Sequence, residues 1–287
     1  MEKQKTIKKE FSLEGKGLQT GRPVRAFFYP EPEESGIVFA RKDIKGTPGA
    51  KLGSSLKSYA DKRRSGIELA GGAHIETVEH VTAALWGAGI DNIRIELDSP
   101  ETPCMDGGAL RFLEELERSG IKEGASPRKY VTIREPVWVE EGDSFVGVFP
   151  DRDFRIFCLF EPKNSSLRRQ VFSKEITYEV FRKEIAPART IWIVPGGERF
   201  LKIKAFIVRF LGYGRGVSEK TVLAVGRKGI LNKEVIAGEP VRHKVLDLIG
   251  DLYLLGRPLR ARVIAIRPGH RLNLMLVDKI RRVAYEG

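Results

Sequence analysis

The stretch PVRHKVLDLIGDLYLLG, residues 240–256, indicates both a helix and a functional group of side chains. Its leading proline suits the first turn of a helix, and its final glycine is typical of a helix end. His243 and Asp247 lie four residues apart, so a helix over 241–255 points both side chains the same way. Such a pair can hold one metal ion, although a surface hydrogen bond is the commoner reason for this spacing.

The order of elements around this helix repeats an order found earlier in the chain. A predicted helix over 77–88 leads into a strand over 93–97, and the later helix leads into a strand over 259–266. Strand-like runs precede both helices, at 24–29 and 36–40 in the first case and at 130–133, 136–139, 144–149 and 154–160 in the second. We therefore predict an α+β fold of two similar domains, each a β-sheet layer packed on α-helices.

The predicted domain boundary lies at the sequence GASP, Gly124–Pro127, which is typical of a linker. We place one α+β domain at 1–126 and a second at 127–287. Thr77 and Thr177 are expected to cap the helices that follow them. Further helices are expected over 109–119, over 177–185 and from about Arg271.

Composition and charge indicate a globular protein of a reduced compartment. The 287 residues carry 50 Lys+Arg against 38 Asp+Glu, a formal net charge of +12, and 41% are apolar, too many for a disordered chain. Cys104 and Cys158 stand far apart, without CxxC spacing. No apolar run reaches the ~20 residues of a membrane span, and the basic N-terminus lacks a signal-peptide core. We expect a cytoplasmic protein with an anionic partner, for which nucleic acid is the first candidate.

Histidine is scarce, so the positions of the four histidines are informative. His80 and His243 each open a predicted helix, and His270 lies in a Pro-Gly-His turn. Joined with Asp247, His80 and His243 would make two histidines and a carboxylate, a set that leaves one position for water as catalytic zinc sites do. Spacing alone does not bring the three together, and each histidine could equally be a core or surface residue.

Two charged neighbours of these histidines suit hydrolytic chemistry. Glu79, beside His80, is placed to act as a general base near any metal held there. Lys244, beside His243, could stabilise an oxyanion or a phosphate. Each also has a plainer interpretation, Glu79 as a first-turn glutamate favoured by the helix dipole and Lys244 as a solvated lysine.

Longer motifs resemble one enzyme family. TVEH at 77–80, the 240–256 stretch with its embedded HxxxD, and GHRLN at 269–273 are similar to motifs of the zinc-dependent UDP-3-O-acyl-N-acetylglucosamine deacetylases, which catalyse the committed step of lipid A synthesis in Gram-negative bacteria. The HxxxD stretch is highly specific, whereas the other two are weak alone. Supporting matches follow in family order over nearly the whole chain: GKGLQTG at 15–21, GIDNIRIEL at 89–97, PCMDGG at 103–108 and ART at 188–190.

The resemblance implies a metal site and a reaction. A Zn²⁺ ion, with Fe²⁺ as the alternative in the cell, would be held by His80, His243 and Asp247, with Glu79 as general base. The implied reaction is hydrolysis of the N-acetyl amide of UDP-3-O-(3-hydroxyacyl)-N-acetylglucosamine, which releases acetate and a free amine. The active site would lie between the two domains.

The remaining implied roles concern the intermediate and the substrate. His270, oriented by Asp251, would be the cation that stabilises the tetrahedral intermediate and protonates the amine. Thr190 would help to stabilise the oxyanion, and Lys244 would contact the substrate. The stretch FLKIKAFIVRFL, 200–211, has apolar residues at helical spacing; its plain interpretation is a core-facing helix with a basic outer side. The resemblance implies that it lines a passage for the acyl chain, through Phe200, Ile203, Phe206, Ile207 and Phe210, with Ile191 as a further contact.

The chain departs from the family pattern around the substrate. Gln19 replaces a histidine, Gly108 a serine, Ile191 an aromatic residue and Arg271 a small residue, and 212–220 matches a Gly- and Ser-rich segment poorly. The changes at Ile191 and at 212–220 motivate an alternative, a divergent zinc deacetylase of another acylated amino sugar. A basic nucleic-acid-binding protein on an enzyme-derived fold is disfavoured, because no nucleic-acid motif occurs. We expect a monomer that binds no nucleic acid and contacts the inner membrane surface peripherally.

Overall fold

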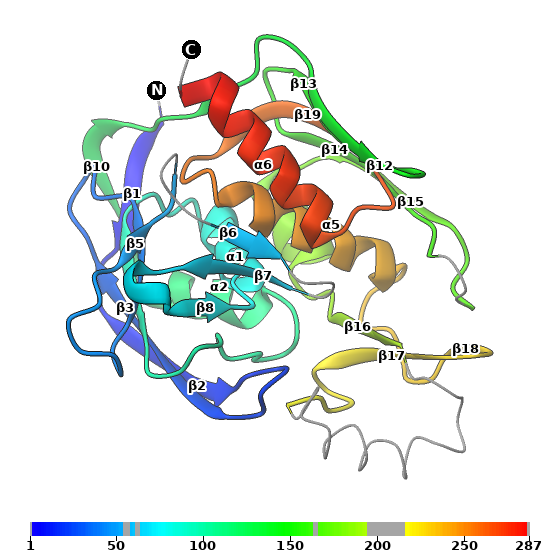
Figure 1. The fold of residues 1–287 in the computed structure, drawn as a ribbon, viewed down its shortest axis with the longest axis horizontal. Coiled ribbons are helices and arrows are strands. Elements are labelled where there is room, and N and C mark those ends of the chain that lie inside the picture. Colours follow the sequence, from blue (N-terminus) through cyan, green and yellow to red (C-terminus); the bar gives the residue numbers. More distant parts are fainter. Residues whose placement is uncertain (1, 54–57, 61–63, 163–165, 194–215, 286–287) are drawn as a thin grey trace.

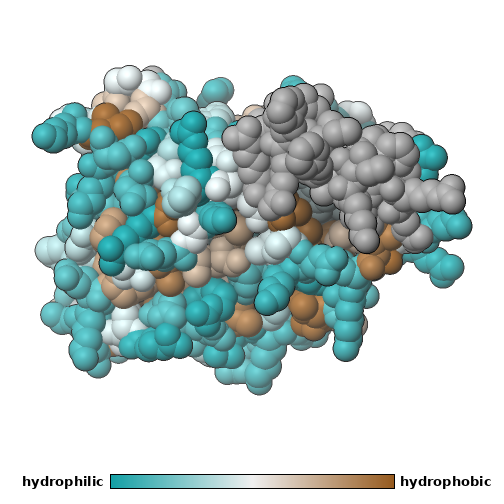
Figure 2. Space-filling view, turned by 90° about the horizontal axis from the view of Figure 1, so that it is seen from below, coloured by the Kyte–Doolittle hydropathy of each residue, from teal (hydrophilic) through white to brown (hydrophobic). Residues whose placement is uncertain are grey.

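The computed structural model describes residues 2–53, 58–60, 64–162, 166–193 and 216–285. Two mixed sheets lie on the outside of the fold and four helices lie between them (Figure 1). Buried apolar side chains from both halves of the described chain form one continuous cluster. One face of the molecule is mostly hydrophilic, with hydrophobic side chains in separate patches (Figure 2). The arrangement confirms the predicted α+β class.

The two sheets have the same strand order. The first contains, in spatial order, β2 (Phe11–Lys16), β3 (Pro23–Pro30), β9 (Ile93–Leu97), β4 (Ile37–Arg41) and β5 (Ala50–Lys51). The second contains β12 (Val137–Glu141), β13 (Ser144–Pro150), β19 (Leu259–Ile266), β14 (Arg155–Phe160) and β15 (Gln170–Glu175), with β11 (Val131–Thr132) beside β19.

The strand directions match as well. In each sheet the fourth strand of the order pairs parallel with the third, and the other pairs along that order are antiparallel. The additional strand β11 also pairs parallel with β19. The parallel strands need a long connection between them, and in both halves a helix lies in that connection. The prediction that the two halves resemble each other is therefore confirmed at the level of sheet topology.

Four helices occupy equivalent places in the two halves. α1 (Glu79–Ala88) precedes β9 and α2 (Leu110–Arg118) follows it; α5 (Glu239–Tyr253) precedes β19 and α6 (His270–Tyr285) follows it. α1 and α5 touch closely, because a Cβ atom on Gly250 would lie 2.0 Å from the carbonyl oxygen of Glu79. Thr82 Oγ1 also donates to the Gly250 carbonyl oxygen at 2.9 Å. This contact brings the residues at the start of α1 onto α5.

Each half carries an insertion between its fifth strand in chain order and its first long helix, which is α1 in the first half and α5 in the second. The first insertion contains β6 (Ser58–Ala60), β7 (Ser65–Glu68), the short 3₁₀ helix η1 (Ala70–Gly72) and β8 (His74–Glu76). The second contains α3 (Tyr178–Val180), the π-helix η2 (Phe181–Ile185), β16 (Thr190–Ile193), β17 (Val222–Gly226) and β18 (Gly229–Ile230). The insertions therefore enter the two halves at the same point of the topology.

The segment predicted as a linker is a strand. Gly124–Pro127 lies within β10 (Ile121–Pro127), which pairs antiparallel with β1 (Lys3–Ile7). Turn-forming residues suggested a loop, but the ladder with β1 and the hydrogen bonds from the Ala125 and Ser126 N–H groups to Glu33 hold the segment extended. The division of the chain at 126/127 stays a prediction.

The predicted strands over 24–29, 36–40, 93–97 and 259–266 are confirmed, and the helix predicted over 241–255 is α5, with a proline in its first turn. The Thr177 cap is confirmed, since its side chain accepts from the Val180 N–H at 3.2 Å. The Thr77 cap is wrong. Val78 precedes α1, while Thr77 has a left-handed φ of 59° and its hydroxyl donates to Glu101.

Candidate active site

Three helix segments bring the predicted polar residues together. Glu79 and His80 form the first turn of α1, and His270 is the first residue of α6 rather than part of a turn. α5 contributes a stripe along one side, His243, Lys244, Asp247 and Asp251. Apart from half-buried Lys244, every one of these residues is buried. A cluster of charged and ionisable groups in this setting requires specific partners, because burial of an unpaired charge is costly.

His80, His243 and Asp247 converge in space, as the family resemblance implied. One ligand atom from each lies within 4.8 Å of the others. His243 Nε2 is 3.3 Å and His80 Nε2 is 3.9 Å from Asp247 Oδ1, and the two imidazole rings meet edge to face with centroids 5.3 Å apart. Asp247 Oδ1 is buried and has no hydrogen-bond partner among the described residues. An oxygen left open between two imidazole nitrogens is what a metal-ligand set requires.

Neighbouring groups orient two of these side chains. His243 Nδ1 lies 3.1 Å from the carbonyl oxygen of Ala188, which can only accept, so Nδ1 carries the proton and Nε2 offers a lone pair. Lys244 Nζ donates to Asp247 Oδ2 at 2.7 Å, which leaves Oδ1 for a metal. These two hydrogen bonds therefore fix the tautomer of His243 and leave Asp247 Oδ1 free.

Glu79 is held from the first insertion. The Ser65 hydroxyl and the Ser65 backbone N–H both donate to Glu79 Oε2, at 2.7 and 3.2 Å. Glu79 Oε1 lies 3.9 Å from His270 Nε2. Burial raises the pKa of Glu79 to about 7, which suits a group that takes up a proton near neutral pH.

His270 is surrounded by carboxylates. Its Nδ1 lies 2.9 Å from Asp251 Oδ2, and its Nε2 lies 3.7 Å from Asp247 Oδ2. Asn273 Nδ2 donates to the same Asp251 oxygen at 2.8 Å. Burial opposes the charged imidazolium, but Asp251, Asp247 and Glu79 outweigh it and raise the pKa of His270 to about 10. His270 is therefore a cation at neutral pH.

The two other histidines are shifted the opposite way. Burial lowers the pKa of His80 to about 3, and burial lowers the pKa of His243 as well. Burial alone would raise the pKa of Asp247, but His243 and Lys244 outweigh it and hold that pKa below its usual range. Neutral imidazoles and an ionised carboxylate are the protonation states in which these residues bind a metal.

A cavity of about 350 Å³ opens above these residues. Thr190 and Ile191 of β16 and Lys244 of α5 line it, as do Glu79, His80, His243, Asp247 and His270. Thr190 Oγ1 donates to the Gly107 carbonyl oxygen at 3.2 Å. The predicted substrate contacts Phe200, Ile203, Phe206, Ile207 and Phe210 lie outside the described residues.

The departures from the family pattern fall in different places. Gln19 and Ile191 line the cavity, and Gln19 Oε1 is buried without a partner in the part of the chain that the structure describes. A side chain on Gly108 would meet the Ala186 carbonyl oxygen at 2.5 Å. Arg271 forms an exposed ion pair with Glu141 at 2.9 Å. Of these four changes, Gln19 and Ile191 are the ones that line the cavity.

Sequence reasoning missed the residues that support the site. Arg189 is buried and binds Glu239 at the start of α5, with its N–H and Nε donating to Glu239 Oε1 at 2.9 and 2.8 Å. This pair fixes β16 against α5, which sets the Ala188 carbonyl on His243 and Thr190 at the cavity. Ser65 was missed because it lies in no motif and its partner is distant in sequence. Arg189 and Asn273 lie in the motifs ART and GHRLN, but these motifs alone assign them no role.

The chain is similar to known proteins over nearly its whole length. A UDP-3-O-acyl-N-acetylglucosamine deacetylase of Syntrophus aciditrophicus is 36% identical over 279 residues, which cover 96% of this chain and 85% of that protein. One from Myxococcus xanthus is 36% identical, with coverage of 96% and 86%. A bifunctional enzyme LpxC/FabZ of Porphyromonas gingivalis is 34% identical over 98% of this chain and 65% of its own length. The sequence profile of LpxC, UDP-3-O-acyl N-acetylglycosamine deacetylase, matches residues 4–282, so the chain belongs to this family.

Proposed function

We propose that the chain hydrolyses the N-acetyl amide of UDP-3-O-(3-hydroxyacyl)-N-acetylglucosamine, a step of lipid A biosynthesis, in the cavity between α1, α5 and α6. Family membership supports the activity. The observation that carries the assignment of residues is the convergence of two neutral imidazoles, an open carboxylate oxygen, a buried glutamate and a buried imidazolium on one cavity. The products are acetate and the free 2-amino sugar.

The metal in this proposal is Zn²⁺ held by His80, His243 and Asp247, with Fe²⁺ as the alternative ion in the cell. Two facts support the fit: Asp247 Oδ1 has no other partner among the described residues, and His243 presents Nε2 toward it. Two imidazoles and one carboxylate with a position left for water are the ligands of catalytic zinc sites. The chemistry supplied by the bound ion is Lewis-acid polarisation of the amide carbonyl and acidification of the attacking water.

The chain's own residues move the protons. Glu79 takes a proton from the attacking water through Oε1, because Ser65 occupies Oε2. His270 carries positive charge beside the cavity, where it stabilises the developing oxyanion and then donates its Nε2 proton to the leaving amine. Asp251 accepts from His270 Nδ1 and so aims Nε2 at the reacting atoms. Thr190 supplies a hydroxyl near the oxyanion, and Lys244 is a cation for the substrate.

The family resemblance also suggests where the protein acts and what it contacts. No helix among the described residues is long and apolar enough to cross a membrane. We place the enzyme in the cytoplasm as a monomer of two domains, 1–126 and 127–287, with peripheral contact to the inner membrane and no nucleic-acid partner. Phe200, Ile203, Phe206, Ile207 and Phe210 are proposed to contact the acyl chain. The +12 charge suits the diphosphate of the substrate.

A coupled assay of acetate release and bound metal tests the proposal. We expect one metal ion per chain and turnover of the UDP-linked acyl sugar, and we expect Glu79→Ala to abolish turnover while the metal content stays unchanged. Glu68→Ala, an exposed glutamate of β7, is the matched control. Full activity of Glu79→Ala would overturn the mechanism. Stoichiometric metal without turnover would favour a different acylated amino sugar, the alternative that Gln19 and Ile191 motivate.

A further inference from the structure

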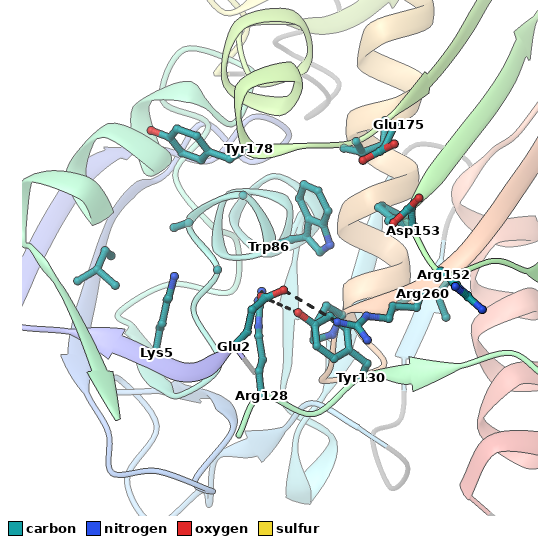
Figure 3. Close-up of a pocket in the computed structure, with 18 of the residues that line it drawn as sticks. Glu2, Lys5, Trp86, Arg128, Tyr130, Arg152, Asp153, Glu175, Tyr178 and Arg260 are labelled. Carbon is teal, nitrogen blue, oxygen red and sulfur yellow. Dashed lines mark hydrogen bonds and ion pairs between the residues drawn. The ribbon is translucent and has the colours of Figure 1, made fainter. Parts of the chain in front are cut away.

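A second and larger cavity lies at the other end of α1 from the catalytic residues. Its volume is about 600 Å³, within the ~300–1,000 Å³ of small-molecule sites. The last turn of α1 and its Gly89 cap form one side, and segments of both halves, including β10, β15 and β19, form the rest. Figure 3 shows that the side chains around it come from elements far apart in the sequence. The proposed mechanism does not use this cavity, and the family motifs reach it only at Gly89, the first residue of GIDNIRIEL.

Most of the carboxylates that line the cavity form ion pairs with arginines outside it. Three of the lining carboxylates bind arginines outside it: Glu117 binds Arg182 at 3.3 Å, and Asp153 and Glu175 bind Arg155 at 3.0 and 2.8 Å. The lining cations are Lys5, Arg128, Arg152 and Arg260. Asp91 pairs with Arg128 at 2.9 Å, whereas Lys5 and Arg152 have no ion pair within 4.0 Å to any residue that the structure describes. Lys5 and Arg152 are therefore lining cations that a bound anion can pair with.

One carboxylate of the chain already lies on these cations. Glu2 accepts from the Tyr130 hydroxyl at 2.6 Å and from Arg128 Nη1 at 3.5 Å, and its other oxygen is 4.0 Å from Arg260 Nη2 (Figure 3). The Tyr130 hydrogen bond helps to hold the pKa of Glu2 below its usual value. These donors therefore form an anion-binding group whose present occupant is a carboxylate.

The occupant can leave without unfolding its strand. The Glu2 side chain is 56% exposed, and the β1–β10 ladder begins one residue later, at Lys3 and Pro127. The Arg128 N–H binds the Glu2 backbone carbonyl oxygen, a contact that does not involve the carboxylate. Rotation of one surface side chain thus frees the Tyr130 hydroxyl, Arg128 Nη1 and the Arg260 guanidinium, while Arg128 Nε stays paired with Asp91.

Aromatic rings form the adjoining wall. Trp86 is half-buried and packs on Phe154 and Phe181, with ring centroids 5.3 and 5.5 Å apart. Tyr130 lies under the Arg260 guanidinium, 3.8 Å from its ring centroid. A rigid aromatic surface beside a cationic anchor binds molecules that join an apolar body to an anion.

We propose that this cavity binds a small organic carboxylate with an aromatic or aliphatic body, the body against Trp86 and the carboxylate in place of Glu2 on Tyr130, Arg128 and Arg260. The carboxylate is the shared chemistry of two sources, a free acid of the cell and the C-terminus of a peptide. The proposal does not depend on the deacetylase assignment, because no residue of this site lies in the catalytic cavity.

The test titrates the full-length, metal-loaded protein with 3-phenylpropionate and with its neutral amide. The readout is the indole N–H resonance of Trp86, identified by its loss in Trp86→Phe, so that acid bound to the catalytic metal does not register. We expect the acid to shift this resonance and the amide to leave it unchanged. Glu2→Ala should tighten binding roughly tenfold because it removes the competing carboxylate. Arg260→Ala should weaken binding by about tenfold because it removes a charged donor.

Arg262→Ala is the matched control, because Arg262 is an exposed arginine two residues along β19 that does not line the cavity. Equal effects of Arg260→Ala and Arg262→Ala, equal binding of acid and amide, or no shift in either wild type or Glu2→Ala would each overturn the proposal. Phenylalanine-terminated peptides with a free or amidated C-terminus form the second arm. Tighter binding of the free-acid peptide assigns the site to a protein C-terminus, and tighter binding of 3-phenylpropionate assigns it to a free acid.

Discussion

The two halves of the chain share one sheet topology but use their first helices differently. α1 contributes Glu79 and His80 from its first turn alone, and the rest of the helix is apolar or small. α5 contributes His243, Lys244, Asp247 and Asp251 over several turns. Both helices occupy the same place in their halves, so topology does not decide which residues are catalytic.

The closeness of the two helices explains this asymmetry. The start of α1 lies on the middle of α5, where Gly250 leaves room for the Glu79 backbone. Only the first turn of α1 therefore faces the cavity, whereas α5 runs beneath it. Each half supplies one of these helices. Because α1 reaches α5 with its first turn only, two residues of α1 and four residues of α5 belong to the site.

The insertions extend the same comparison. The first insertion supplies Ser65, which holds Glu79, the proposed general base. The second supplies Thr190 of β16 and, two residues before it, the Ala188 carbonyl oxygen that contacts His243. Each insertion supports a residue that its own half's first helix provides. The following predictions test this division of roles.

The largest effect is expected at the residue that joins the two helices. Asp247→Ala removes the ligand oxygen shared by His80 and His243 and leaves the Lys244 ammonium without its partner. We expect the purified protein to lose its metal and acetate release to fall to background, measured by elemental analysis and product chromatography. Retention of one tightly bound metal would show that the three residues are not the ligand set.

Glu79→Gln tests the contribution of α1 without removing a ligand. We expect kcat to fall about 10²- to 10⁴-fold, the usual contribution of a general base, with metal content unchanged. Because burial raises the pKa of Glu79 from 4.5 to about 7, the folded state keeps this proton at higher pH than the unfolded state. Its contribution to stability is full below about pH 4.5 and is lost as pH rises to about 7.

The same variant therefore makes a thermal prediction. In metal-free protein, Glu79→Gln should flatten the pH dependence of Tm between about 4.5 and 7 relative to wild type. A parallel pair of Tm curves would contradict the buried, proton-retaining glutamate.

Gly250→Ala tests the contact between the helices. The new methyl group would lie 2.0 Å from the Glu79 carbonyl oxygen, so α1 must move away from α5. We expect a loss of about 1–3 kcal/mol in the free energy of unfolding, as for an overpacked core, and a fall in kcat of about 10²-fold from misplacement of the base. Urea unfolding and steady-state kinetics on the same preparation check both. Unchanged kcat in a destabilised protein would separate packing from catalysis.

Ser65→Ala tests the support from the first insertion. It removes the 2.7 Å hydrogen bond to Glu79 Oε2 but keeps the backbone donor. We expect kcat to fall about five- to tenfold, equivalent to roughly 1 kcal/mol, with KM unchanged and partial recovery in Ser65→Cys. In the Glu79→Gln background, Ser65→Ala should have no further effect. A fully additive loss would mean that Ser65 acts elsewhere.

Arg271→Ala is expected to have the smallest effect. Its ion pair with Glu141 is exposed at both ends, and such pairs contribute about 0–1 kcal/mol. Although Arg271 follows the catalytic His270, we expect kcat and KM to remain within about twofold of wild type. A marked rise in KM would show that this side chain reaches the substrate.

Local pattern predicted the elements well and the connections poorly. Period-2 apolar runs defined β3, β9 and β19, and the spacing of His243 and Asp247 placed them together on α5, because both features depend on neighbours in sequence. Gly124–Pro127 misled because its conformation depends on β1, more than a hundred residues away. Ser65 and Ala188 carry no local signal for their roles. The three-residue metal set could be predicted only by comparing the long motif with a family.

Thr77 has a consequence for the balance between stability and activity. A β-branched residue at a φ of 59° is strained by roughly 1–2 kcal/mol, and it lies two residues before Glu79, the proposed general base. Its hydroxyl and carbonyl oxygen bind Glu101 and Thr102, which hold the chain in that strained bend. This strained backbone orients Glu79 toward the cavity and lowers the stability of the folded state. Selection for thermal stability alone would be expected to remove this strained conformation first. The enzyme would then become more stable and less active.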